Sequence, residues 1–339
     1  MPIRAFSAVS THLNHCKLLN RLIVCGLFAA ILMTSRLSEA SIGRLNRYEY
    51  ARAAMGVRAR IVVYAPDRRT AELACQRAFD RLAELEDVMS DYRPSSELMR
   101  LCAKAGGPPV KVSKDLLMVL LRAREVSKIS NGAFDVTVGP LVRLWREARK
   151  TLRLPDPSKL QSSLKLVGWQ KMCIDPKRST VRLKFPGMLL DLGGIAKGYA
   201  CDEALKVLKR CRISRALVEM GGDIALGDPP PGKRGWLIEI PCAPTDLRRQ
   251  ELSNCGVSTS GDAEQFVEID GQRYSHIVDP RTGLGVTDRI EVTIIASDCT
   301  TSDSLATAIS VLGTQKDTEL LKRCYPKARI FMRKATDGG

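Results

Sequence analysis

Histidine is scarce in this sequence of 339 residues. There are three histidines, and two of them, His12 and His15, lie within the first 20 residues. Because those residues resemble a removable leader, His276 is the only imidazole in the body of the chain, and any proton transfer by an imidazole near neutral pH depends on it. It stands in the run from Tyr274 to Gly283, where Asp-Pro and Thr-Gly indicate a turn that can present polar groups. Taken alone, the run also fits a histidine whose ring only closes the turn by hydrogen bonding.

Cysteine pairs with the spacing of metal or redox motifs are absent. Nine cysteines follow residue 40, and none of them forms a Cys-x-x-Cys pair. This excludes metal-cluster and thioredoxin-like sites on spacing. An odd number of cysteines in an exported protein can include disulfides and a free thiol, but the sequence assigns no partners, and small buried residues are the default for most of them.

Aromatic residues are few, at 5% of the sequence, and we find no helix-turn-helix pattern and no basic stripe interleaved with aromatic residues. These absences argue against nucleic acid as a partner. The formal charge is +16, and about +13 remains without the first 40 residues, which contain four basic groups and one acidic group. Such a surplus favours anionic partners, such as an anionic lipid surface or a phosphate-bearing ligand. The alternative is that the basic residues only form solvated faces.

No apolar run is long enough to span a bilayer. The longest candidate, Leu22–Met33, has 12 residues, whereas a transmembrane helix needs roughly 20. Arg4, Lys17 and Arg21 precede this run, and Ser38-Glu39-Ala40 offers a cleavage site of the small-x-small type. This order predicts a secretory signal over the first 40 residues and export to the periplasm or cell envelope. An uncleaved anchor through the same apolar run is the alternative, and it implies peripheral or anchored membrane association.

Hydrophobic periodicity predicts an α+β fold with a mixed sheet. Strands are expected at 58–64, 216–219, 236–240, 265–269, 273–278 and 291–296, and helices at 70–89, 113–130, 196–210 and 301–312. The length allows one large domain or two closely joined subdomains. We place that domain at 55–335, after a linker at 41–54, with a candidate subdomain junction near 155–163.

The densest cluster of glycine and charged residues is Asp-Leu-Gly-Gly-Ile-Ala-Lys-Gly-Tyr at 191–199. It follows a predicted apolar strand at 188–190 and opens a helix. Glycines let backbone amides approach a ligand, and a helix N-terminus attracts phosphate. The run is not a P-loop, because Gly198 follows Lys197 and the Gly-x-x-x-x-Gly-Lys order is absent, and its glycines do not have the Gly-x-Gly-x-x-Gly order. The alternative is a tight strand-to-helix turn with Lys197 in solvent.

Asp303 and Thr307 lie four residues apart on the last predicted helix, so their oxygens share one face. Hard oxygen donors in this arrangement suit Mg²⁺. The alternative is a capping carboxylate and a hydroxyl bonded back to its own helix.

Three more segments place glycine turns beside polar side chains, at 132–141, 220–223 and 258–262. None is a serine-hydrolase elbow, because residues 256–260 break the Gly-x-Ser-x-Gly order. In order along the chain, the segments resemble the ApbE family of FAD:protein FMN transferases from Met55-Gly56 to about Gly313. The close matches are Gly-Ala-Phe-Asp-x-Thr-Val-Gly-Pro-Leu at 132–141, Asp-Leu-Gly-Gly-Ile-Ala-Lys-Gly-Tyr-Ala at 191–200 and His-Ile-x-Asp-Pro-x-Thr-Gly at 276–283.

The resemblance implies an ApbE-like fold and an enzyme that requires Mg²⁺. Its reaction would move FMN from FAD, through a phosphoester bond, onto a threonine or serine hydroxyl of an acceptor redox protein, with AMP leaving. Position by position, the resemblance makes His276 the general base. It implies a metal site formed by the carbonyl oxygen of Gly194 with Asp303 and Thr307. The implied flavin-nucleotide contacts are Met55, Tyr92, Ala133, Phe134, Asp135, Asp191, Lys197 and Val257.

Two positions depart from the family pattern. Val57 stands where threonine usually follows Met-Gly, and Glu219 stands where asparagine commonly precedes the Gly-Gly-Asp turn. Glu219 brings a negative charge to a region that the resemblance places near the nucleotide. Two other functions remain open: hydrolysis of FAD to FMN and AMP, with water in place of the acceptor hydroxyl, and binding of FAD without catalysis.

Overall fold

The computed structural model describes residues 45–261, 266–313 and 318–334. The predicted leader lies outside these residues, and so does the apolar run at 22–33. Among the residues described, no helix combines the length and apolar character needed to cross a membrane. The described residues from Arg47 onward form one compact unit.

A seven-stranded sheet with the order β1-β2-β6-β7-β10-β13-β14 lies at the centre of this unit. From β2 to β14 each neighbouring pair is antiparallel. The α+β class is therefore confirmed, although the strand pairs are antiparallel where a mixed sheet was expected. The strands are β1 (Asn46–Ala54), β2 (Val57–Ala65), β6 (Ala216–Met220), β7 (Asp223–Leu226), β10 (Cys255–Ser260), β13 (Ile290–Ala296) and β14 (Arg329–Lys334).

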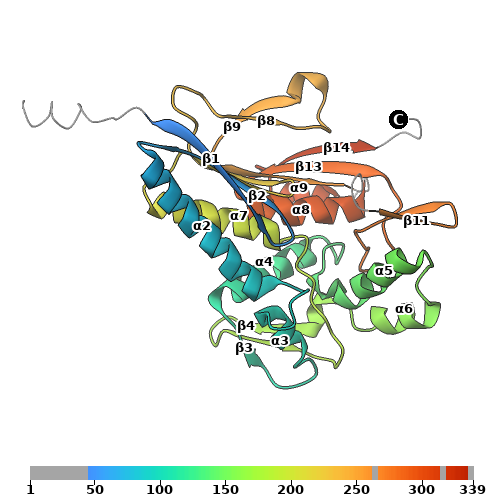
Figure 1. Cartoon of the computed structure of the whole chain (residues 1–339). Helices are drawn as coiled ribbons and strands as arrows, with labels where there is room; N and C mark the ends of the chain where they lie inside the picture. Colours follow the sequence, from blue (N-terminus) through green and yellow to red (C-terminus); the bar gives the residue numbers. More distant parts are fainter. Residues whose placement is uncertain (1–44, 262–265, 314–317, 335–339) are drawn as a thin grey trace, which may run out of the picture. The chain divides into compact units, whose positions relative to one another are not determined.

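The two faces of the sheet are covered differently (Figure 1). Helices α2 (Arg68–Met89), α7 (Ala196–Arg210) and α8 (Cys299–Leu312) pack on one face, and the hairpin of β8 (Trp236–Glu239) and β9 (Arg249–Leu252) covers the other. The alternation of strand side chains produces both cores. In β6, Val218 and Met220 enter the helical core, whereas Leu217 enters the core beneath the hairpin.

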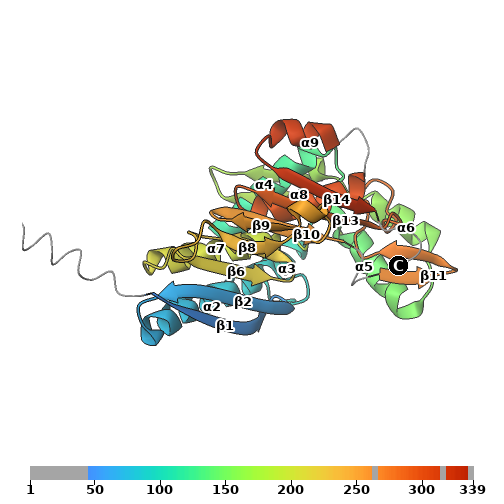
Figure 2. The same cartoon turned by 90° about the horizontal axis from the view of Figure 1, so that it is seen from above.

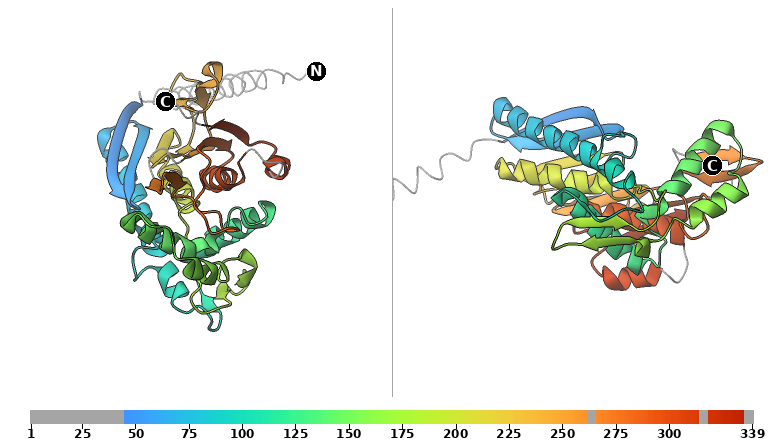
Figure 3. Two further views of the ribbon diagram at one scale, coloured as in Figure 1. Left: turned by 90° about the vertical axis from the view of Figure 1, so that its right-hand side faces the viewer. Right: turned by 90° about the horizontal axis from the view of Figure 1, so that it is seen from below.

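Below α2 lie short elements that Figures 1 and 3 place together. Their helices α3 and α4 pack against α2, and α4 also contacts α8 and β4. The elements are α3 (Glu97–Cys102), α4 (Lys114–Ile129) and the small sheet β3-β5-β4, with β3 at Val110–Lys111, β5 at Thr180–Leu183 and β4 at Met172–Asp175. A further helix, α9 (Thr318–Cys324), contacts α4 and α8.

A third group of elements lies together in Figures 1 and 2 and has a hydrophobic cluster of its own. Trp145 and Leu141 of α5 pack there with Val278, which follows β12. The group consists of the 3₁₀ turn η1 (Val136–Val138), α5 (Gly139–Thr151), α6 (Pro157–Leu164), β11 (Phe266–Ile269) and β12 (Gln272–Ser275).

Most predicted elements are confirmed with small changes at their ends, and α7 has the predicted bounds of 196–210. Three segments need correction. The linker at 41–54 is wrong from residue 46 onward, because Asn46–Ala54 is the edge strand β1. The candidate junction at 155–163 is mostly helix α6, which Asp156 caps through Ser158 N and Lys159 N. The predicted strand at 188–190 has no strand partner; instead Leu190 N donates to Cys102 Sγ at 3.3 Å.

Candidate active site

Lys197, near the start of α7, lies between two carboxylates. Its Nζ is 2.7 Å from Asp223 Oδ2 and 3.7 Å from Asp303 Oδ2. The Asp223 and Asp303 side chains are 3% and 6% exposed, and the Lys197 side chain is 25% exposed. The interpretation of Lys197 as a solvated turn residue is therefore wrong.

The charges in this cluster are not balanced. Burial raises the pKa of Asp303 to about 7, and the Asp223 carboxylate adds to the rise. Burial alone would lower the pKa of Lys197, but the two carboxylates outweigh it and raise that pKa above its usual value. One ammonium beside two buried carboxylates leaves one negative charge when both are ionised. A bound cation would offset that charge, because buried charges need partners.

Two glycines four residues apart, Gly194 in the turn before α7 and Gly198 in its first turn, let this segment approach α8 closely. A Cβ on Gly194 would lie 2.7 Å from Thr307 Oγ1, and one on Gly198 would lie 2.8 Å from Asp303 Cβ. The amide of Gly198 donates to Asp303 Oδ2 at 2.9 Å. These contacts bring Gly194 beside Thr307 and Gly198 beside Asp303.

The residues present fit a hard cation. A backbone carbonyl, a carboxylate and a hydroxyl are the oxygen donors that Mg²⁺ takes in proteins. Asp303 is inside α8, and the cap of that helix is Asp298, so Asp303 does not cap its own helix. Its Oδ2 instead accepts from Gly198 N in the first turn of α7. Within the described ranges no group of three or more His, Cys, Asp and Glu residues is arranged to hold a metal. A metal beside Asp303 would therefore depend on the carbonyl and hydroxyl oxygens.

Asp191 and Tyr92 meet at one arginine. Asp191 Oδ1 accepts from Gly193 N at 2.8 Å, and its Oδ2 accepts from Arg146 Nη2 at 3.2 Å. Arg146 also pairs with Asp91 at 2.5 Å, and its guanidinium carbon lies 4.3 Å from the centre of the Tyr92 ring. Burial and the nearby Asp91 carboxylate raise the pKa of Asp191. Tyr92 is 76% exposed.

Ala133, Phe134 and Asp135 are buried between α4 and η1. Asp135 Oδ1 accepts from Thr137 N at 2.8 Å, and its Oδ2 accepts from Trp169 N at 2.6 Å. Burial raises the pKa of Asp135, and these hydrogen bonds oppose the rise. The Asp135 carboxylate therefore holds the loop in shape and is already occupied by backbone amides.

Two contacts connect the other predicted nucleotide residues. Asp191 N donates to Val136 O at 2.8 Å, which joins the Ala133–Asp135 segment to the Asp191 turn. Met55 has a positive φ of 50° in the β1–β2 turn, and its amide donates to Glu86 Oε2 at 3.2 Å. Glu86 in turn pairs with Arg93 at 3.0 Å, beside the Tyr92 turn.

The Val257 side chain does not join this group. It packs in the core beneath the β8–β9 hairpin with Trp236. Its neighbour Ser258 points toward α8 and shares a hydrogen bond of 2.8 Å with Ser302. Because strand side chains alternate, Val257 and the Lys197 cluster lie on opposite faces of the sheet.

His276 follows β12 in a turn that other residues hold in shape. Ile277 N donates to Ser275 Oγ at 3.1 Å, and Gly283 N donates to Asp279 O at 2.8 Å. The His276 side chain is half-buried. Helix α5 connects this turn to the Asp191 turn, because Trp145 Nε1 donates to Gly283 O at 2.8 Å and the next residue is Arg146, which binds Asp191.

The structure shows the contacts of Glu219 and Val57, the two residues that depart from the family pattern. Glu219 Oε2 accepts from Arg60 Nε at 2.7 Å across the β2–β6 pair. Glu219 alternates with Met220, so it lies on the sheet face opposite the Lys197 cluster, and its charge is paired. Val57 lies against Gly221, with 3.1 Å between its Cγ1 and a Cβ built on that glycine.

Sequence reasoning did not assign a role to Asp223 or Arg146. Asp223 had a signal, because it ends the Gly-Gly-Asp turn, but only the fold shows that its carboxylate meets Lys197. Arg146 had no local signal, since an arginine on an amphipathic helix is ordinary. A cavity of about 400 Å³ lies near the N-terminus of α8, and none of the predicted site residues lines it.

Comparison with known proteins identifies the family. The model of the ApbE family matches residues 55–332, which is most of the sequence. The chain belongs to the ApbE family. The resemblance predicted from the sequence motifs is thereby confirmed.

The ApbE-family relatives that this chain matches are named as enzymes. It is 32% identical over 296 residues to the FAD:protein FMN transferase of Klebsiella pneumoniae, with 86% of this chain and 90% of the relative covered. It is 36% identical over 302 residues to that of Treponema pallidum, with 83% of each chain covered. The prediction of a FAD:protein FMN transferase agrees with these names.

Solved structures confirm the ApbE fold. The flavin transferase ApbE of Vibrio cholerae superposes with a TM-score of 0.76 at 30% identity, covering 87% of this chain and 96% of that chain. The ApbE protein of Thermotoga maritima gives the same TM-score of 0.76 at 29% identity, with 86% and 97% covered.

Proposed function

We propose that this protein is a Mg²⁺-dependent FAD:protein FMN transferase that joins FMN through a phosphoester bond to a threonine or serine of a redox protein. The observation that carries the proposal is the buried contact between α7 and α8, where Lys197, Asp223 and Asp303 adjoin Gly194 and Thr307. The names of the relatives support the choice of substrate, and this geometry supports the proposal of a metal and the phosphates at this contact.

The residues that would hold Mg²⁺ are Asp303, Thr307 and, through its carbonyl oxygen, Gly194. A Mg²⁺ ion held by these residues would supply positive charge that offsets the negative charge of the pyrophosphate. Asp223 keeps the Lys197 ammonium in place, and this positions a second positive charge without any movement during the reaction.

The transfer step exchanges one oxygen on phosphorus for another. The acceptor hydroxyl attacks the phosphorus of the FMN half of FAD, the bond to the AMP phosphate breaks, and AMP leaves with the bonding electron pair. The hydroxyl proton goes to a base, and His276 is the residue we assign to it. The turn that contains His276 is hydrogen-bonded to α5 through Trp145 Nε1 and Gly283 O, which supports a fixed position of the imidazole. Such transfers depend mostly on positioning and charge stabilisation, so a base adds about 10²- to 10⁴-fold.

The flavin nucleotide would lie along the Asp191 turn. The exposed Tyr92 ring, braced by Arg146, offers a surface on which an aromatic ring can stack. Ala133 and Phe134 are buried in the segment that joins this turn, and Met55, in the β1–β2 turn, is linked through Glu86 to Arg93 beside Tyr92. Val257 can contribute only through its backbone from this side of the sheet.

The first 40 residues support an envelope location. Their basic start, short apolar run and small-x-small site have the order of a secretory signal. We therefore propose that the acceptor is an exported redox protein or an envelope redox subunit that faces the same compartment.

A product assay tests the proposal. The protein is incubated with FAD, Mg²⁺ and the unmodified form of a redox protein that has a threonine-linked FMN site. We expect the acceptor to gain the mass of FMN phosphoester, with AMP in equal amount. Free FMN and AMP without modified acceptor would instead identify a FAD hydrolase, and unchanged bound FAD would identify a binding protein.

A further inference from the structure

Helix α7 and the turn just before it contact α8 along a stripe with a repeat of four residues on each side. Gly194 meets Thr307, Gly198 meets Asp303 and the carbonyl of Cys299, and Asp202 meets the amides of Cys299 and Thr300. Positions four apart share one face of a helix, so the stripe runs antiparallel along both helices. The first two contacts contain the proposed metal ligands, and the third has no assigned role.

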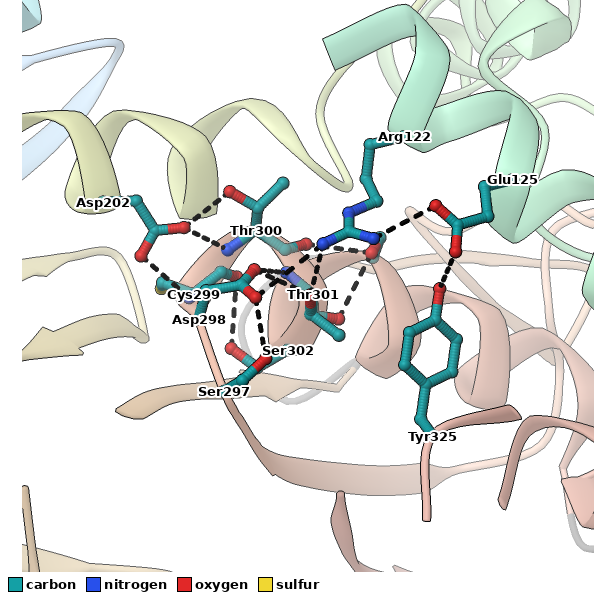
Figure 4. Close-up of polar contacts among 11 residues, drawn as sticks. Arg122, Glu125, Asp202, Ser297, Asp298, Cys299, Thr300, Thr301, Ser302 and Tyr325 are labelled. Carbon is teal, nitrogen blue, oxygen red and sulfur yellow. Dashed lines mark hydrogen bonds and ion pairs between the residues drawn. The ribbon is translucent and has the colours of Figure 1, made fainter. Parts of the chain in front are cut away.

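The third contact is a carboxylate that binds the start of the neighbouring helix. Asp202 Oδ1 accepts from Cys299 N at 2.9 Å. Its Oδ2 accepts from Thr300 N at 2.8 Å and from Thr300 Oγ1 at 2.6 Å. Figure 4 shows this carboxylate reaching from α7 to the first turn of α8. Hydrogen bonds to an ionised acceptor are among the stronger ones in proteins, and three of them act here at once.

A second carboxylate near the start of α8, that of Asp298, caps the helix. Asp298 Oδ1 accepts from Thr301 N at 2.8 Å and from Thr301 Oγ1 at 2.7 Å, which caps α8 from within its own segment. Arg122 of α4 donates to Thr301 Oγ1 at 3.3 Å and stands 3.8 Å from Asp298. Of the two aspartates, Asp202 is the one that ties α8 to α7.

We infer that Asp202 is a positioning residue, which fixes the register of α8 on α7 so that Asp303 and Thr307 stay beside Gly194. This inference rests on the proposed Mg²⁺-dependent function. Asp202 stands two repeats from Gly194 on the stripe and acts on the metal ligands only through α8.

The register of α8 matters because a Mg²⁺ site tolerates little displacement of its ligands. Mg²⁺ demands near-ideal ligand geometry, so a displacement of a few tenths of an ångström along the stripe weakens its binding. The glycine contacts limit how closely the helices approach, and the hydrogen bond from Gly198 N to Asp303 Oδ2 is one fixed point between them. The three hydrogen bonds of Asp202 are a second fixed point four residues further along each helix, so the two helices resist sliding and pivoting. When only a fraction of molecules keeps the register, the apparent Mg²⁺ affinity falls by the same fraction.

The test is a titration of the purified protein with Mg²⁺ alone, followed by calorimetry and by the melting temperature, with no assay of transfer. We expect Asp202→Ala to need about tenfold more Mg²⁺ for half-saturation than the parent protein. Asp298→Ala is the matched control, because it also removes a carboxylate from the first turn of α8 but leaves the tie to α7. It should lower the melting temperature comparably and change the Mg²⁺ requirement less than about twofold.

A milder variant guards against failure to fold. Asp202→Asn keeps one acceptor and turns an amide group toward the other donor, so we expect a smaller rise in the Mg²⁺ requirement, between parent and Asp202→Ala. Equal shifts in Asp202→Ala and Asp298→Ala, or no shift in either Asp202 variant, would overturn the positioning role while leaving the proposed function intact. A parent protein that binds no Mg²⁺ would refute the proposed metal dependence and the inference with it.

Discussion

Replacing Gly194 with alanine tests whether the contact between α7 and α8 is the metal site. A Cβ at this position would lie 2.7 Å from Thr307 Oγ1 and 2.9 Å from Thr307 Cγ2. Real contacts of this kind are longer, so Thr307 must move by about half an ångström in a closely packed, half-buried contact. Overpacking of this size costs about 1–3 kcal/mol.

The movement should affect metal binding more than the fold. Because Mg²⁺ keeps its ligands near 2.0–2.1 Å in strict geometry, we expect Gly194→Ala to raise the half-saturating Mg²⁺ concentration by about tenfold or more. The melting temperature should fall by about 2–10 °C. Both quantities come from one Mg²⁺ titration followed by thermal unfolding.

Gly261→Ala is the control for the same substitution, because the nearest atom to a Cβ there, Glu291 Cα, is 3.6 Å away. It should leave the Mg²⁺ requirement unchanged. If Gly194→Ala binds Mg²⁺ and transfers FMN as the parent does, Thr307 and the Gly194 carbonyl are not metal ligands and the geometric reasoning fails.

Three more predictions concern the base, the buried carboxylate and the departure at residue 219. His276→Ala should slow FMN transfer by about 10²- to 10⁴-fold while FAD affinity, read from flavin fluorescence, stays nearly the same; full transfer by this variant would remove His276 from the mechanism. Because burial raises the pKa of Asp303 to about 7, the metal-free protein favours its protonated form and loses that stabilisation as the pH rises through 7. Protons and Mg²⁺ then compete, so Mg²⁺ should bind about tenfold more tightly at pH 8 than at pH 6, and equal affinities at the two pH values would contradict this. Glu219→Gln should change the free energy of unfolding by about 1 kcal/mol or less, because Glu219 and Arg60 are both about one-third exposed. The same variant should leave FAD affinity unchanged. A large change in FAD affinity would place Glu219 at the nucleotide.

The sequence predicted the long amphipathic elements well because their periodicity is strong. α7 and α2 have buried residues at helical spacing, and glycine or polar turns mark their ends. Strand β1 has no such signal: it is an edge strand with mostly exposed side chains, so its apolar alternation is weak. Helix α6 was missed because it has no fully buried residue.

Part of the site could be predicted because several of its residues stand in local sequence motifs. Gly194, Lys197, Asp303 and Thr307 stand in motifs whose spacing already limits their geometry, and the fold brings them together. The partner of Lys197 is Asp223 on another strand, and no local pattern contains that pairing. The position of Val257 depends on which face of β10 is turned to the helices, and only the strand register decides this.

The measurement that tests the central claim most directly compares parent and Asp303→Ala protein in FMN transfer across a range of Mg²⁺ concentrations. The modified acceptor is counted by its mass. If Asp303 with Thr307 and Gly194 holds the metal, the parent should modify the acceptor only with Mg²⁺ present, and Asp303→Ala should bind Mg²⁺ weakly and leave the acceptor unmodified. An Asp303→Ala protein that transfers FMN with the Mg²⁺ dependence of the parent would contradict the account.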